Sequence, residues 1–186
     1  MPKLSPEPVF LGLLEAQTSY GYHLLDQFRS TEQLGQIWNL GTSQLYAILK
    51  RLERDELIDG REESRPDAPM RTVYWLTDRG REQLYLWLND PSPSASTRHI
   101  RTEFLSRLYI ADLLGQPIGP IVDAQQAACQ RYCQTLEQAH DKRIGRIAGL
   151  ALDLRRREQA LILDWLETCR RPRRATLAPP PSPQDV

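Results

Sequence analysis

The sequence predicts a mainly α-helical protein with a small β-hairpin, built as an N-terminal winged helix-turn-helix and a C-terminal helical dimerisation domain. Three observations support this fold class. Apolar residues recur at helical spacing up to about residue 55, the period changes to two between residues 58 and 76, and helical stripes return after residue 97. This order of elements is more specific than any one of them.

Charge and cysteine content limit the classes of partner and compartment. The chain has 186 residues, with 24 Lys and Arg against 24 Asp and Glu, so its net charge gives no sign of a polyanionic partner. Three cysteines without framework spacing fit a reducing compartment, and we expect a cytoplasmic protein. The apolar run 9–14 is too short to span a bilayer, so no membrane association is expected.

Proline-rich segments divide the chain. Residues 1–90 are predicted to form the winged helix-turn-helix DNA-binding domain, 91–96 a linker, and 97–169 the helical dimerisation domain. The tail, residues 170–186, is rich in Arg and Pro and poor in apolar residues, so it is predicted to be disordered.

The first three helices are predicted over residues 6–16, over a segment after Gly21, and over about 42–55. In the second, we expect Tyr22, Leu25 and Phe28 to share the core face. The third divides into two faces. Its core face carries Leu45, Ile48, Leu49 and Leu52, and the opposite face carries Ser43, Ala47, Lys50, Arg51 and Arg54.

A hairpin and a fourth helix follow. Residues 71–76 alternate as a strand whose partner is 58–64, with the turn at 66–69. Either Thr77 or Asp78 is expected to cap the fourth helix. The inner face of that helix carries Leu84, Trp87 and Leu88.

The second domain is predicted to be entirely helical. We expect a helix capped by Thr97, a long helix over 120–149 and a last helix over 150–169. The long helix carries one apolar stripe and the last helix another: Val122, Cys129, Cys133, Leu136 and Ile147 on the first, Leu154, Leu161 and Trp165 on the second. Because two helices cannot bury both stripes, a homodimer is expected.

The third helix carries the residues expected to contact double-stranded DNA. At its start, Gln44 can bond adenine bidentately and Ala47 can approach a thymine methyl group. The full set of candidates is Ser43, Gln44, Tyr46, Ala47, Lys50, Arg51 and Arg54, joined by Arg71 in the wing. The acidic wing residues Glu62, Glu63 and Asp67 are expected on the outer side or paired with arginines.

Other interpretations of these features stay open. The basic helix face is also what an ordinary solvated helix shows, since Glu53 and Asp55 flank it. With zero net charge, the same fold is also compatible with a protein-interaction module that regulates a protein partner. Salt dependence of binding separates these hypotheses.

Several short motifs are spread along most of the chain. They are Gly21-Tyr22, the segment from Gln44 to Asp55, Pro69-Met70-Arg71, Tyr74 to Thr77, Gly80, Phe104 to Asp112, and Trp165-Leu166. In these residues the chain resembles the PadR family of winged-helix transcriptional regulators. The resemblance implies a homodimer joined through its C-terminal helices that binds a pseudo-palindromic operator, usually as a repressor released by a signal. Glu56 stands where the family usually has Gly, which puts the end of the recognition helix in question.

Sites for small ligands are less clearly marked. Aromatic residues that could line an effector pocket are Trp87, Tyr109, Tyr132 and Trp165, although core packing explains each equally well. Redox sensing by Cys129 and Cys133 would need Cys169 or a second chain, and packing is the simpler interpretation. The three histidines show no nucleophile or metal spacing, so we expect no enzyme, cofactor or metal.

Overall fold

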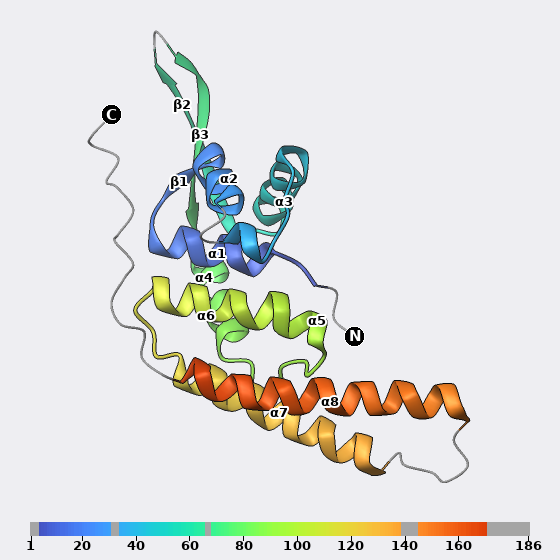
Figure 1. Ribbon diagram of the computed structural model, residues 1–186. Helices are drawn as coiled ribbons and strands as arrows, with labels where there is room; N and C mark the ends of the chain where they lie inside the picture. Colours follow the sequence, from blue (N-terminus) through green and yellow to red (C-terminus); the bar gives the residue numbers. More distant parts are fainter. Residues whose placement is uncertain (1–3, 31–33, 66–67, 139–144, 171–186) are drawn as a thin grey trace.

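The computed structural model describes residues 4–30, 34–65, 68–138 and 145–170. Helices predominate, with one small antiparallel sheet, so the predicted fold class is confirmed (Figure 1). Among these described residues, no helix combines the length and apolar content that crossing a membrane requires.

The first half of the chain forms what we call the winged unit. Its elements are α1 (Glu7–Ala16), β1 (Ser19–Tyr20), α2 (Gly21–Arg29), the 3-10 turn η1 (Leu34–Gln36), α3 (Thr42–Arg54), β2 (Ile58–Arg65), β3 (Ala68–Leu76) and α4 (Asp78–Leu88). The hairpin β2–β3 extends away from the rest of the molecule as the wing (Figure 1). The Thr77 hydroxyl accepts the Gly80 N–H at 3.0 Å, so Thr77 is the cap of α4.

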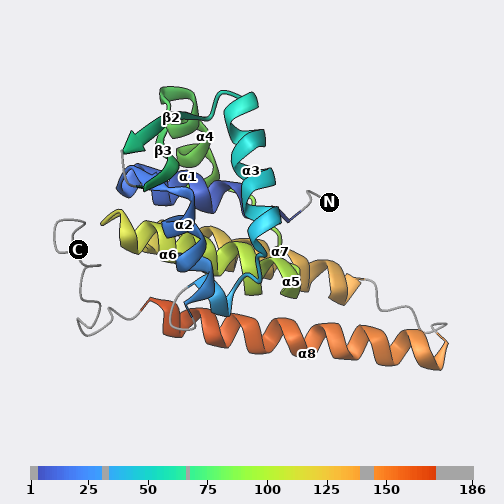
Figure 2. The ribbon, with the colours of Figure 1, turned by 90° about the horizontal axis from the view of Figure 1, so that it is seen from above.

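The second half contains helices and connecting segments and has no strand in its described part. It comprises α5 (Thr97–His99), the π-helical turn η2 (Ile100–Phe104), α6 (Leu105–Leu113), α7 (Gly119–Gln138) and α8 (Arg146–Cys169). Figures 1 and 2 show α7 and α8 running side by side, with α6 between this helical pair and the winged unit.

The sheet has three strands, in the order β1-β3-β2, where the sequence predicted only a hairpin. β1 pairs Ser19 with Tyr74 and Tyr20 with Val73. Two residues are too few to show an alternating pattern, so this strand could not be seen from periodicity. The predicted turn is also shorter than expected, because Ala68 and Pro69 already belong to β3.

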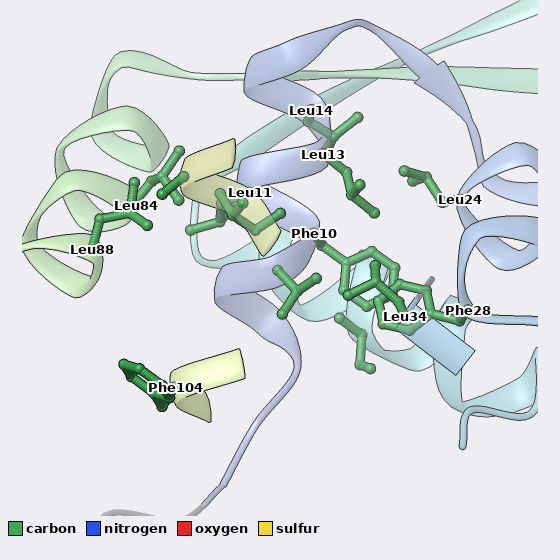
Figure 3. Close-up of a cluster of buried hydrophobic side chains, with 14 of the residues drawn as sticks. Phe10, Leu11, Leu13, Leu14, Leu24, Phe28, Leu34, Leu84, Leu88 and Phe104 are labelled. Carbon is green, nitrogen blue, oxygen red and sulfur yellow. The ribbon is translucent and has the colours of Figure 1, made fainter. Parts of the chain in front are cut away.

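One continuous core joins the two halves. Phe10 stacks on Phe28 with ring centroids 4.8 Å apart, and Leu34 lies beside them (Figure 3). The core continues through Phe104 into the helical half. At the junction, a Cβ on Gly12 would lie 2.4 Å from a methyl group of Ile110, so only glycine lets α1 approach α6 this closely.

α3 ends in a left-handed residue. Glu56 has φ +57°, the only positive φ at a non-glycine residue in the described part of the chain. The N–H of Leu57 bonds the carbonyl of Leu52 and that of Glu56 bonds Glu53, both at 2.9 Å, which is the Schellman pattern. The helix therefore keeps the termination expected for glycine, and Glu56 adopts the strained conformation.

Several boundaries correct the expectations from sequence. The predicted helix 120–149 is wrong, since α7 ends at Gln138 and α8 begins at Arg146; residues 139–144 lie outside the described part, as does the tail beyond residue 170. The cap of α5 is Ser96 rather than Thr97, because the Ser96 hydroxyl accepts the N–H of His99. Tyr22 is 37% exposed, so α2 turns Leu24 rather than Tyr22 into the core.

The helical pair buries one face of each helix and leaves an apolar stripe uncovered. On α7, Val122, Cys129 and Leu136 are buried as expected, whereas Cys133 is only half-buried. On α8 the buried apolar residues are Leu152, Ile162 and Leu166. The exposed stripe of α8 consists of Ile147, Leu150, Leu154 and Leu161, each 58% exposed or more.

Candidate nucleic-acid interface

The exposed face of α3 is the first part of the candidate interface. Leu45, Ile48, Leu49 and Leu52 are all buried, as predicted, and they fix the helix on the core. The opposite face is exposed and carries Ser43, Gln44, Tyr46, Ala47, Lys50, Arg51 and Arg54. Figure 1 shows α3 and the wing on the side of the molecule away from α7 and α8.

The N-terminal turn of α3 has one side chain already engaged. Oε1 of Gln44 accepts the backbone N–H of Gly41 at 3.0 Å, so Gln44 caps its own helix. Its amide nitrogen has no partner among the described residues. Tyr46, two residues further along, packs against Gly21, where an added Cβ would lie 3.1 Å from the Tyr46 ring.

Two of the three basic side chains on this face are paired with acids. Arg51 contacts the carboxylate of Glu7 from α1. Arg54 donates from Nε to Asp55 at 3.0 Å. Lys50 is exposed and makes no hydrogen bond or ion pair within the described segments. Lys50 is therefore the cation of α3 that an anionic ligand meets without displacing a carboxylate.

Arg71 lies at the base of the wing in an aromatic cluster. Its guanidinium sits 5.4 Å from the ring centroid of Tyr22, a cation–π geometry, and it also donates to the Tyr22 hydroxyl at 3.4 Å. Tyr22 stacks on Tyr20 with centroids 5.6 Å apart. The sequence marked Gly21-Tyr22 only as part of a resemblance, and nothing in its pattern predicted that Tyr22 carries Arg71.

One of the three acidic wing residues, Glu63, departs from the prediction. Glu63 stands opposite Arg71 in the strand register but accepts a hydrogen bond from the Tyr20 hydroxyl at 2.9 Å, and no arginine pairs with it in the described part of the wing. Glu62 is exposed. Asp67 lies outside the described residues.

Arg29 is a further basic residue that sequence reasoning missed. From the end of α2 it donates to the Thr42 hydroxyl at 3.2 Å, which places an exposed guanidinium at the start of α3. The two contacting residues are 13 positions apart and lie on different helices, so no periodic pattern indicated this contact.

The four aromatic residues predicted for an effector pocket occupy separate places. Trp87 donates to Glu103 at 3.2 Å, Trp165 packs edge-on against Phe104, and Tyr132 is half-buried. Tyr109 donates to Gln27, which lines a cavity of about 220 Å³ beside α1 and α2. A second cavity, of about 570 Å³, opens between α7 and α8. None of the four lines either cavity.

Burial disfavours the thiolate form of the three cysteines. Burial raises the pKa of the Cys129, Cys133 and Cys169 thiols, so less of each is present as the reactive thiolate at neutral pH. Cys129 is fully buried within the helical pair.

The fold and this exposed helix beside a wing define the class of protein: a winged helix-turn-helix transcriptional regulator. The family model of the PadR-like transcriptional regulators matches residues 10–85. The negative transcriptional regulator PadR of Bacillus subtilis is 32% identical over 133 residues, which cover 71% of each chain. The chain therefore belongs to the PadR-like family of transcriptional regulators, a class of proteins that are not enzymes.

Solved structures of this family are similar to the chain. The crystal structure of Bacillus subtilis PadR in complex with operator DNA is 24% identical, covers 88% of this chain and 95% of its own, and superposes with a TM-score of 0.45. The crystal structure of the same protein in complex with p-coumaric acid is 24% identical, covers 88% and 92%, and gives a TM-score of 0.41.

Proposed function

We propose that this chain is a homodimeric repressor that binds a pseudo-palindromic operator, with α3 in the major groove and the wing on the adjacent backbone. The observation that carries the proposal is the division of α3 into a fully buried apolar face and an exposed face next to the wing, whose Lys50 has no partner among the described residues. A helix held in this way can enter a groove without unfolding any core contact.

Each exposed residue of α3 has a role set by its place on the helix. Ser43, Gln44 and Ala47 lie in the first turns, where base edges are within reach. Gln44 keeps its amide hydrogens for an acceptor on a base while its oxygen caps the helix. Tyr46 donates to the DNA backbone through its hydroxyl.

The basic residues contribute in different ways. Lys50 meets phosphate directly, whereas Arg51 and Arg54 exchange an acidic partner for phosphate. Arg71 is held on Tyr22 and presents its guanidinium to the backbone beside the wing. The exchanges at Arg51 and Arg54 make the affinity depend on carboxylates that are present in the free protein.

The dimer joins through the helical pair. The exposed stripe of α8 is long and apolar, and a second copy of the chain covers it in this proposal. Residues 1–90 then act as the DNA-binding domain and 97–169 as the dimerisation domain.

The direction of regulation is assigned from a relative. The Bacillus subtilis protein is named a negative regulator, and this chain aligns with it over 71% of its length.

A small-molecule effector releases the DNA in this proposal, with Trp87, Tyr109, Tyr132 and Trp165 as the aromatic candidates for its contacts.

Salt dependence of DNA binding tests the proposal. The DNA is a fragment from upstream of the protein's own coding sequence, compared with a random fragment of equal length. If each Lys50 neutralises one phosphate, Lys50→Ala lowers the log–log salt slope by about 0.9 for each protomer, or about 1.8 for a dimer. Glu7→Gln frees Arg51 and should strengthen binding at moderate salt.

Arg131→Ala provides the matched control, because Arg131 is an exposed basic residue of α7, a helix that lies away from α3 and does not carry the exposed stripe (Figure 1). It should leave the slope unchanged. An unchanged slope for Lys50→Ala removes that residue from the contact surface. Equal, weakly salt-dependent binding to both fragments would contradict the proposal and favour a protein partner.

A further inference from the structure

The linker between the two halves is held at both of its ends. It joins α4 to α5 and is taken here from Asp90, one residue before the predicted start, to Ser96; Pro91 and Ser92 within it are exposed. Pro91 and Pro93 each fix one backbone dihedral angle, and Pro93 is buried. Ser96 ends the segment as the cap of α5. This composition makes a stiff connection rather than a flexible one.

The first linker residue is tied to α6. The Asp90 carboxylate accepts from the Ser92 N–H at 2.9 Å and from the Arg107 guanidinium at 3.0 Å. Arg107 is only 3% exposed and also pairs with Glu103 at 2.8 Å. Its guanidinium lies 5.4 Å from the ring of Trp87 on α4, so the end of the winged unit and the start of α6 share one buried charged group.

The last part of the linker is gripped by two glutamines, one from each helix of the pair. Nε2 of Gln125 on α7 donates to the carbonyl of Ser94 at 3.0 Å. Nε2 of Gln159 on α8 donates to the carbonyl of Ala95, also at 3.0 Å. Because a carbonyl only accepts, each amide must turn its nitrogen toward the linker. Two helices therefore hold two successive peptide groups.

Both glutamines occupy positions where an apolar residue would be expected. They are 1% and 2% exposed, on the buried faces of α7 and α8. Oε1 of Gln159 has no hydrogen-bond partner among the described residues, so this amide is not the best side chain for stability at its site. Both amides can make their hydrogen bonds only when the linker lies in one position. Buried polar contacts of this kind specify a single arrangement of the chain.

We propose that Gln125 and Gln159 are positioning residues that fix the winged unit relative to the helical pair and thereby set the spacing of the two operator half-sites. The inference rests on the proposed function, since it needs a dimer joined through α8 with one winged unit per half-site. If each unit is held rigidly, the distance and rotation between the two copies of α3 are fixed. Each added base pair moves the half-sites by about 3.4 Å and turns them by about 35°.

The test compares operators that differ only in spacing. Footprinting of the wild-type protein on its own upstream DNA defines the operator, and a second operator carries one extra base pair between the half-sites. The wild-type dimer should bind the longer operator about 100-fold more weakly, since only one half-site can then be engaged. For the double variant Gln125→Leu, Gln159→Leu, the extra base pair should lower the affinity by less than about tenfold. Its affinity for an isolated half-site should equal that of the wild type.

Gln130→Leu is the matched control, because Gln130 is an exposed glutamine of α7, the helix that carries Gln125. This variant should discriminate between the two operators as the wild type does. Should the double variant fail to fold, the single variants Gln125→Met and Gln159→Met retain the side-chain length without the donor, and each should show intermediate discrimination. Sedimentation of each variant should show that it is still a dimer.

Three results would overturn the inference. The first is that the folded glutamine variants discriminate between the two operators as strongly as the wild type does. The second is that the variants are monomers, and the third is that the wild-type protein binds both operators equally well. The absence of any sequence-specific footprint is a different outcome, since it contradicts the proposed function before spacing is examined.

Discussion

The left-handed residue at the end of α3 leads to a quantitative prediction: Glu56→Gly should stabilise the protein. At φ +57° a residue with a Cβ carries a strain of about 1–2 kcal/mol, which glycine does not have. Glycine also lowers stability by roughly 0.5–1 kcal/mol through the entropy of the unfolded chain. This substitution also removes the ion pair with Arg79. Its side chains are largely exposed, Glu56 at 79% and Arg79 at 64%, so the pair contributes little to the free energy of unfolding.

The control that isolates the backbone effect is Glu56→Ala, which removes the ion pair and keeps the Cβ. Glu56→Gly should exceed Glu56→Ala in stability by about 1 kcal/mol, since only the Cβ differs. For a chain of this size that difference corresponds to roughly 2–4 °C in Tm, measured by circular dichroism at one protein concentration. Equal melting temperatures for the two variants would refute the argument from strain.

Three further predictions follow from contacts in the core and at the exposed stripe. Gly80→Ala should lower stability by about 3 kcal/mol in thermal unfolding, because the added Cβ would lie 1.9 Å from the Leu57 carbonyl oxygen; a near wild-type Tm would contradict it. Alkylation of Cys129 and Cys133 at pH 7.5 should be slower than that of a free thiol and should accelerate as the pH rises, since burial raises the pKa of both; rapid labelling at pH 7.5 would disprove this. Leu154→Lys with Leu161→Lys should give a folded monomer in sedimentation, because both side chains are 59% exposed or more; a persisting dimer would place the interface elsewhere.

The winged unit was predictable because its pattern is local. In α3, four apolar residues recur every three or four positions, and all of them are buried as the period requires. The strands of the wing alternate over several residues, and Thr77 caps α4 as its residue type suggests. Short-range chemistry was sufficient for each of these elements.

Features that depend on contacts between distant segments could not be predicted. Nothing near Ser19 in the sequence indicates that it pairs with Tyr74. The sequence predicted one helix over 120–149 because apolar residues keep recurring at helical spacing beyond the real end of α7. Ile147 was therefore assigned to the stripe of that helix, although it belongs to α8. Gln125 and Gln159 look like ordinary helix surface residues, and only the packing of α7 and α8 on the linker buries them.

The zero net charge of the chain and its proposed affinity for DNA are compatible because of where the acids lie. Glu7 and Asp55 pair with Arg51 and Arg54 in the free protein, so the face proposed to meet phosphate is largely neutralised until DNA competes for these arginines. Non-specific binding depends on charge alone, and such pairing therefore weakens it. In the proposed complex, a specific site adds base contacts from the first turns of α3 and can displace the carboxylates. The acidic partners thus favour specificity over raw affinity, which a count of charges along the sequence does not reveal.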